Sequence, residues 1–127
     1  MDLVTNALLI GIATGITSGS AKVTESSITY AFTSLKNLLE KKLSKDHKVL
    51  KAISDLETNP NSPGKKMVLR EEVVEAKLDQ DQEVVVAAKE LIELLKRSPG
   101  GQEIINQTVI GDKNIFSGSG DIFISNK

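Results

Sequence analysis

The sequence predicts an all-α protein: an antiparallel bundle of four to five helices, followed by a flexible tether and a short C-terminal motif. Apolar residues recur at three- and four-residue spacing along several segments before residue 98, which is typical of helices that bury one face. Stretches containing Pro and Gly separate these segments. A chain of 127 residues with 3% aromatic residues suits one small aliphatic core. We therefore predict a helical domain at residues 1–97, a flexible linker at 98–106 and a separate motif at 107–127.

The first segment carries no charge between Asp2 and Lys22, a stretch about long enough to span a bilayer. Polar residues dilute its apolar content, and Asp2 argues against a secretory signal. Small residues recur at every fourth position, which forms a smooth stripe on a helix. They are Ala7, Gly11, Gly15 and Gly19. The stripe could pair helices in lipid, or it could let this helix pack closely on a neighbour in a soluble bundle.

For membrane insertion, we predict the residues that form the apolar and glycine positions of this segment. They are Leu3, Val4, Leu8, Leu9, Ile10, Gly11, Ile12, Gly15, Ile16 and Gly19.

The second segment, residues 22–43, is a strongly amphipathic helix whose apolar face includes Ile28, Phe32 and Leu35. Lysines are concentrated between residues 36 and 51. Such a basic segment can favour anionic lipid headgroups, or it can be the solvated face of a helix. The candidate contacts with anionic lipid are Lys36, Lys41, Lys42, Lys45 and Lys48.

Three further helices are predicted before residue 98. Asp46 is expected to cap the first of them, which ends at the Pro- and Gly-containing break of residues 59–64. The next spans residues 67–78. The last spans residues 83–97 after a cap at Asp79, and its apolar spacing indicates a helix despite three consecutive valines.

The tail, residues 107–127, nearly repeats itself after a shift of seven residues. Its β-branched and aromatic residues predict short strands at 108–110, 114–116 and 121–124. Low net charge, asparagines and the absence of proline are typical of a cross-β segment. A polar tail or an edge hairpin folded onto the body is the alternative.

We expect the tail to be disordered in the resting monomer and to form amyloid on activation. The candidate motif residues are Gln107, Val109, Ile110, Gly111, Asn114, Ile115, Phe116, Gly118, Gly120, Asp121, Ile122, Phe123 and Ile124.

The residues that catalysis or metal binding requires are scarce. His47 is the only histidine and the chain has no cysteine, so we expect His47 to be a surface residue. Residues 15–22 lack the glycine spacing of a phosphate loop. A net charge of −1 argues against general nucleic-acid binding. We therefore predict no enzyme activity, no cofactor, no metal and no nucleic-acid partner.

The spacing from Gly111 to Asn114 resembles amyloid signalling motifs of bacteria and archaea that are similar to the RIP homotypic interaction motif of animals. The animal motif has Gln where this chain has Val109, and the nearest Gln here is Gln107. Together with the Gly/Ala-rich first helix and the lysine cluster, the whole chain resembles the Bell-domain proteins. These are prokaryotic cell-death effectors similar in role to the fungal HeLo domains and the necroptotic four-helix bundle.

The resemblance implies that a STAND/NOD-like receptor with a matching motif seeds a fibril, onto which the tail is templated. The clustered bundles then permeabilise the membrane. Its implied partners are further copies of the chain, the receptor and membrane lipids, with a cytoplasmic location at rest and the cell membrane on activation. Two alternatives stay open: a non-toxic adaptor whose bundle recruits a protein partner, and an ordinary regulatory bundle with an ordered hairpin tail.

Overall fold

The structure is a computed structural model that describes residues 2–14 and 26–108. The described residues form helices and no strand, so the predicted all-α class is confirmed. The elements are α1 (Leu3–Ala13), α2 (Ser26–Lys42), α3 (Lys48–Thr58), α4 (Pro63–Glu75), the 3-10 helix η1 (Leu78–Gln80), α5 (Gln82–Arg97) and α6 (Gly101–Thr108).

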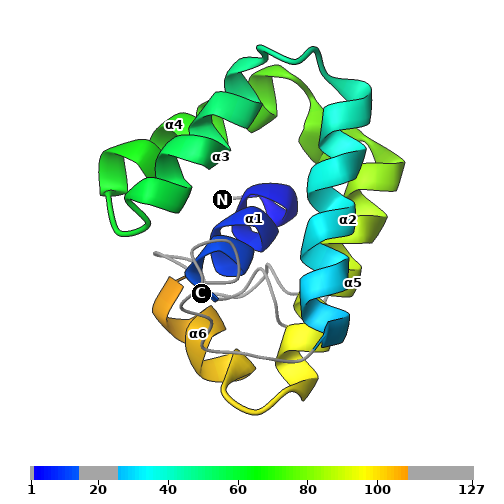
Figure 1. Ribbon diagram of the computed structural model, residues 1–127, viewed down its shortest axis with the longest axis vertical. Coiled ribbons are helices and arrows are strands. Elements are labelled where there is room, and N and C mark those ends of the chain that lie inside the picture. The colour runs from blue at the N-terminus through cyan, green and yellow to red at the C-terminus, as the bar shows by residue number, and fades with distance from the viewer. Residues whose placement is uncertain (1, 15–25, 109–127) are drawn as a thin grey trace, which may run out of the picture.

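Helix α1 lies at the centre of the fold (Figure 1). Helices α2 and α5 run antiparallel along one side of it, and the α3–α4 hairpin lies on the other side. Helix α6 closes one end and contacts both α1 and α5. The molecule is therefore two antiparallel helix pairs arranged around a central helix.

The central position of α1 follows from its composition, because large apolar residues are distributed around all of its sides. Each residue from Val4 to Ile12 is buried, and Val4, Ala7, Leu8 and Ile10 have no exposed surface. A helix that is hydrophobic all round needs to be covered all round. Burial of each large aliphatic side chain stabilises the fold by about 1.5–3 kcal/mol. The core of the domain is therefore built on its first helix.

Within the described residues, the glycine stripe allows close packing between helices. A Cβ atom added at Gly11 would lie 2.3 Å from Cδ1 of the Phe32 ring in α2. Phe32 itself has no exposed surface, so its ring occupies the space that a larger residue at position 11 would need. This geometry matches the soluble-bundle interpretation of the stripe at Gly11. Gly15 and Gly19 lie outside the described residues.

Two of the predicted helix caps are wrong. The side chain of His47, and not Asp46, caps α3, because its Nδ1 accepts a hydrogen bond from the Val49 N–H at 3.1 Å. Asp81, and not Asp79, caps α5, because its Oδ1 accepts from the Glu83 and Val84 N–H groups at 3.1 and 3.3 Å. In both cases a later polar residue lies at the true helix start.

The predicted fourth helix is wrong at both ends. Helix α4 begins at Pro63 because the Ser62 Oγ accepts a hydrogen bond from the Lys65 N–H at 3.2 Å. Proline at the first helical position is compatible with a helix start, since its missing N–H would have had no partner there. The helix ends at Glu75, and Lys77 then adopts a left-handed conformation with φ of 59° before η1 begins.

The flexible linker predicted at residues 98–106 is also wrong. After a turn in which Gly100 takes φ of 81°, the chain forms α6. Ile104 and Ile105 are buried in this helix, and they join the same core as α1 and α5. Two adjacent isoleucines beside polar residues suffice to anchor one short helix. The predicted helix at residues 22–43 is observed as α2 from Ser26, and the fifth helix is confirmed as α5 with a start one residue earlier.

Candidate functional site

The candidate site is the central helix α1 together with the elements that cover it. The predicted insertion residues Val4, Leu8, Leu9, Ile10, Gly11 and Ile12 are buried, and Leu3 is partly buried against the core. The predicted residues Gly15, Ile16 and Gly19 lie outside the described residues. The apolar surface expected to meet lipid is therefore enclosed by protein in this structure.

Side-chain hydrogen bonds satisfy backbone groups at both ends of α1. At the start, Asp2 caps the helix, because its carboxylate accepts from the Thr5 N–H at 2.8 Å and the Thr5 hydroxyl at 2.7 Å. At the end, the buried Thr14 hydroxyl donates to the Gly11 carbonyl at 2.6 Å. These bonds satisfy polar groups that burial would otherwise make unfavourable. The helix is thus suited to an interior position although it contains Thr5 and Asn6 and is followed by Thr14.

Helix α6 is the cover of α1 that leads into the tail. Ile104 and Ile105 are 7% and 2% exposed, and α6 contacts both α1 and α5. The turn before α6 is tight: a Cβ atom at Gly101 would lie 1.8 Å from the Leu95 carbonyl oxygen. The sequence pattern did not predict Ile104 and Ile105 as part of the candidate site. The available signal in the sequence was the pair of adjacent isoleucines.

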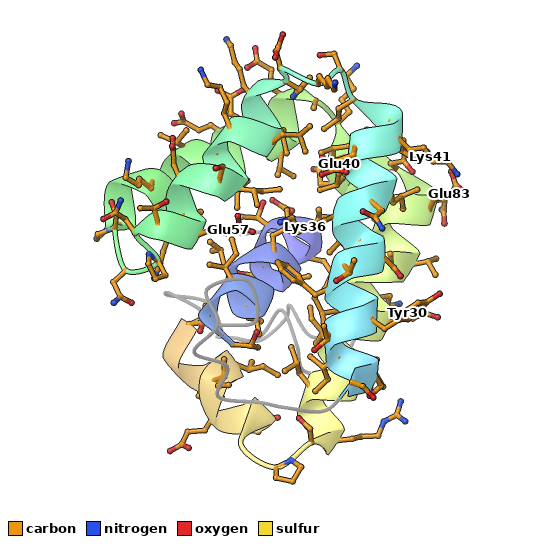
Figure 2. All side chains as sticks on the ribbon, in the orientation of Figure 1. Tyr30, Lys36, Glu40, Lys41, Glu57 and Glu83 are labelled. Carbon is orange, nitrogen blue, oxygen red and sulfur yellow. The ribbon has the colours of Figure 1, made fainter. Side chains whose placement is uncertain are left out.

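Two of the predicted lipid-contact lysines form ion pairs with other helices, and Figure 2 labels Lys36 together with the acidic residues Glu57 and Glu83. Lys36 of α2 lies 2.7 Å from Glu57 of α3. Lys42 of α2 lies 2.7 Å from Glu83 and 3.1 Å from Asp81, both at the start of α5. These hydrogen bonds, first to Glu83 and then to Asp81, raise the pKa of Lys42 above its usual value. Lys36 and Lys42 are therefore intramolecular partners in this state.

The other predicted lysines are exposed at one corner of the molecule. Lys41 lies in the last turn of α2, Lys45 in the connection, and Lys48 at the start of α3. No ion pair forms at these three side chains with any residue that the structure describes. They form a small basic corner between α2 and α3 that a charged surface could approach.

A comparison with protein-family models matches residues 1–125 to the Het-E N-terminal domain. The chain belongs to the Het-E N-terminal domain family. This family is HeLo-related, and its helical domains are associated with cell death and heterokaryon incompatibility. The family match includes most of the tail as well as the helical body. No curated protein and no solved structure matches the chain.

In this member of the Het-E N-terminal domain family, the central helix is buried and the predicted motif begins within α6. The predicted first strand is wrong at Thr108, because this residue is the last of α6 and is 7% exposed. Gln107 of the predicted motif lies in the same helix. The motif residues from Val109 to Ile124 lie outside the described residues, so the amyloid motif stays a prediction.

The described part of this Het-E N-terminal domain holds no cluster of three or more metal-ligating side chains. His47 is partly exposed and serves as the α3 cap. Over the same residues, no helix combines the length and the apolar character that crossing a bilayer requires. Helix α1 has 11 residues, which corresponds to roughly 16 Å at the usual rise per residue, against about 30 Å of hydrocarbon.

Proposed function

We propose that this chain is a cell-death effector that permeabilises membranes when its tail assembles, and that its resting fold keeps the lipid-active helix covered. The observation that carries the proposal is the enclosure of the predominantly apolar helix α1 by elements that include α6. Helix α6 ends at Thr108, so its last two residues belong to the predicted amyloid motif of residues 107–127. A change in the tail therefore acts directly on a cover of α1.

The first step is assembly of the tail on a seed presented by a receptor with a matching motif. Templating of residues 107–127 into a cross-β stack requires Gln107 and Thr108 to leave the last turn of α6. A helix of 8 residues is marginal in water by itself, so it depends on the packing of Ile104 and Ile105. Assembly also concentrates many bundles on short connections. It therefore weakens α6 and brings the central helices of several copies close together.

The second step is transfer of α1 to the membrane. Because α1 corresponds to roughly 16 Å, the described helix reaches about halfway through the hydrocarbon layer. A single copy would thus disturb one leaflet, and several copies are needed for a larger defect. Pairing along the small-residue stripe that includes Ala7 and Gly11 is one way to gather them.

The third element is attraction to anionic headgroups. Lys41, Lys45 and Lys48 are available for it, at about 1 kcal/mol for each well-placed lysine. Lys36 and Lys42 become available only if their bonds to α3 and α5 open. The proposal places the chain in the cytoplasm at rest and at the cell membrane on activation, without enzyme activity.

Leakage from vesicles tests this proposal. Full-length protein seeded with tail fibrils is added to vesicles containing an anionic lipid, and release of an enclosed dye is measured. Ile115→Pro is expected to abolish both fibrils and leakage, because proline removes a backbone donor from the stack. Ile115→Val is the matched control and should retain both. Equal leakage by the proline variant would remove tail assembly from the mechanism.

An adaptor is the second candidate, and exposed apolar side chains on α4 favour it. Met67, Val68 and Val74 are 44–47% exposed, and Met67 and Val74 lie two turns apart on one face. Such a patch suits a protein partner. Expression of the chain with an induced clustering tag separates the two candidates: an adaptor leaves the cells alive, whereas an effector kills them.

A further inference from the structure

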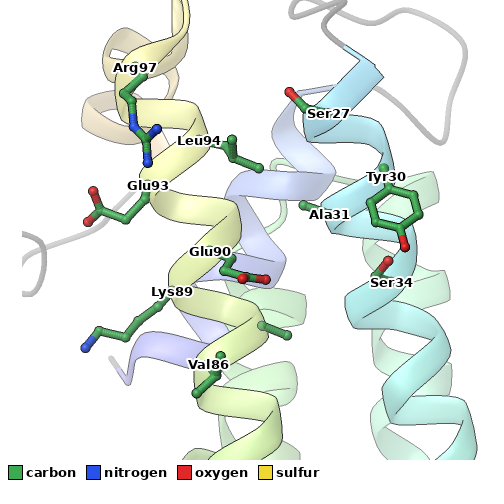
Figure 3. Close-up of a pocket in the computed structure, with 11 residues that line it drawn as sticks. Ser27, Tyr30, Ala31, Ser34, Val86, Lys89, Glu90, Glu93, Leu94 and Arg97 are labelled. Atoms are coloured by element: carbon green, nitrogen blue, oxygen red, sulfur yellow. The ribbon is translucent and has the colours of Figure 1, made fainter.

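A groove follows the outer side of the α2–α5 pair (Figure 3). Its main part has a volume of about 740 Å³. Two smaller hollows extend it along the same helices, with Ser34, Leu38 and Val86 among the shared lining residues. The floor is apolar, since Ala31 and Leu94 point toward each other between the helices. The groove therefore runs along both helices, and the residues that line it belong to α2 and α5.

The groove exposes large apolar side chains on both walls. Tyr30 of α2 is 75% exposed and Val86 of α5 is 53% exposed. Neither residue contributes to the buried core. An exposed apolar surface framed by polar residues is typical of an interaction site. The open question is which partner fits it.

The charges on the groove favour a partner with charges of both signs. Lys89 and Arg97 balance Glu90 and Glu93 on the α5 wall. On the α2 wall, Ser27, Tyr30 and Ser34 are uncharged. This balance gives no preference for an anionic membrane, a nucleic acid or a strongly charged peptide. The mixed charges of the α5 wall do suit a partner surface that carries the same charged residues but runs in the opposite direction.

One side of α5 carries charges that are complementary to the same side of α5 in a second, antiparallel copy of this chain. Val86, Glu90, Glu93 and Arg97 follow one another at three- and four-residue spacing, so they share one side of the helix. Glu90 and Arg97 form no ion pair with any residue that the structure describes. Glu93 is already 3.6 Å from Lys96, which offsets its charge.

We propose that the α2–α5 groove binds the same groove of a second copy in an antiparallel, two-fold arrangement centred near Glu93. In that arrangement, Glu90 of each copy faces Arg97 of the other copy, and the pair occurs twice. A two-fold interface uses one patch on both partners, which is what balanced charges in a single stripe provide. Val86 and Tyr30 extend the contact along the groove.

The contact is weak for free copies, because exposed ion pairs contribute little to binding. It forms when assembled tails raise the local concentration of bundles. The inference thus rests on the proposed function, because tail assembly supplies the raised local concentration. The geometry of the groove does not depend on the proposed function.

Cross-linking at a single introduced cysteine tests the arrangement, since the natural chain has none. Full-length Glu93→Cys, assembled through its tail, is expected to form a dimer with a short bis-maleimide reagent. Ser54→Cys, exposed on α3, is the matched control and should give little dimer. Equal dimer yields at the two positions overturn the proposal. Absence of a Glu93→Cys dimer together with binding of a different protein at the groove also overturns it.

Charge reversal supplies the second arm, carried out in the Glu93→Cys background. Glu90→Arg or Arg97→Glu alone is expected to lower the dimer yield about tenfold, because two attractions become two repulsions. The double variant Glu90→Arg/Arg97→Glu should restore the yield, and so should an equal mixture of the two single variants. A mixture that stays as low as either variant alone overturns the two-fold pairing.

Dye release is recorded in the same samples. Leakage without cross-linking at Glu93 refutes only the groove, whereas cross-linking without leakage refutes only the proposed function.

Discussion

Because Gly11 packs against Phe32, we expect replacement of this glycine by alanine to lower the stability of the fold. Replacement of a glycine in a helix by alanine usually raises it. In an ordinary helix, Gly→Ala stabilises by about 0.8–1 kcal/mol. At Gly11, however, the new Cβ atom would lie 2.3 Å from Cδ1 and 2.5 Å from Cε1 of the buried Phe32 ring. Forcing an extra methyl into a packed core costs about 1–3 kcal/mol. We therefore expect Gly11→Ala to be destabilising by about 0–2 kcal/mol after the two effects are added.

Gly64→Ala in α4 is the matched control, because the nearest atom to its added Cβ is the Ser62 Oγ at 4.0 Å. This variant should be neutral or stabilising. Thermal unfolding followed by circular dichroism measures both, at about 4 °C per kcal/mol for a domain of this size. Phe32→Leu should relieve part of the Gly11→Ala effect in a double-mutant cycle. If Gly11→Ala raised the melting temperature as much as Gly64→Ala, α1 and α2 would not pack as described.

The remaining predictions concern α6 and the start of α5. Ile105→Asp should detach α6 and cause leakage even in the Ile115→Pro background, while the exposed Gln102→Asp should not. A folded but inactive Ile105→Asp/Ile115→Pro variant would exclude α6 as the cover that matters. Asp81→Ala should lower the melting temperature, because the cap and the contact with Lys42 are lost. Asp79→Ala should not lower it, since the buried Asp79 Oδ1 has no hydrogen-bond partner among the described residues. The hydrogen bond from Lys42 lowers the pKa of Asp81, so its contribution to stability is present above about pH 4 and is lost as the pH falls through the lowered pKa.

The extent to which the sequence predicted the fold depended on the length of each apolar pattern. Helix α5 was predicted to within one residue because five buried positions from Val84 to Leu95 repeat at helical spacing. Helix α6 was missed because only two isoleucines mark it, and the preceding Ser-Pro-Gly-Gly is typical of a linker. The caps at His47 and Asp81 were displaced because several polar residues lie next to one another at each helix start, and only geometry selects among them.

The site was harder to predict for a physical reason. An apolar helix with small residues has the same composition whether it packs inside a bundle or enters lipid, so residues 3–13 alone did not distinguish these environments. The contact of Gly11 with Phe32 is a tertiary property that periodicity does not encode. Likewise, six lysines between residues 36 and 51 formed one group in the sequence. The fold separates Lys36 and Lys42, which have acidic partners, from the exposed Lys41, Lys45 and Lys48.

The energetics of α1 determine what must be present for it to leave the core. Val4, Leu8, Leu9, Ile10 and Ile12 are buried, and exposing them to water at about 2 kcal/mol each costs on the order of 10 kcal/mol. That is comparable to the whole stability of a small domain, about 5–15 kcal/mol. Tail assembly alone therefore does not release α1 into water, because lipid or other copies must receive its apolar surface. Amide hydrogen exchange should show residues 4–12 protected in fibrils of the full chain without lipid, and changed only when anionic vesicles are added. Loss of protection in lipid-free fibrils would mean that α1 is not held by the burial described here.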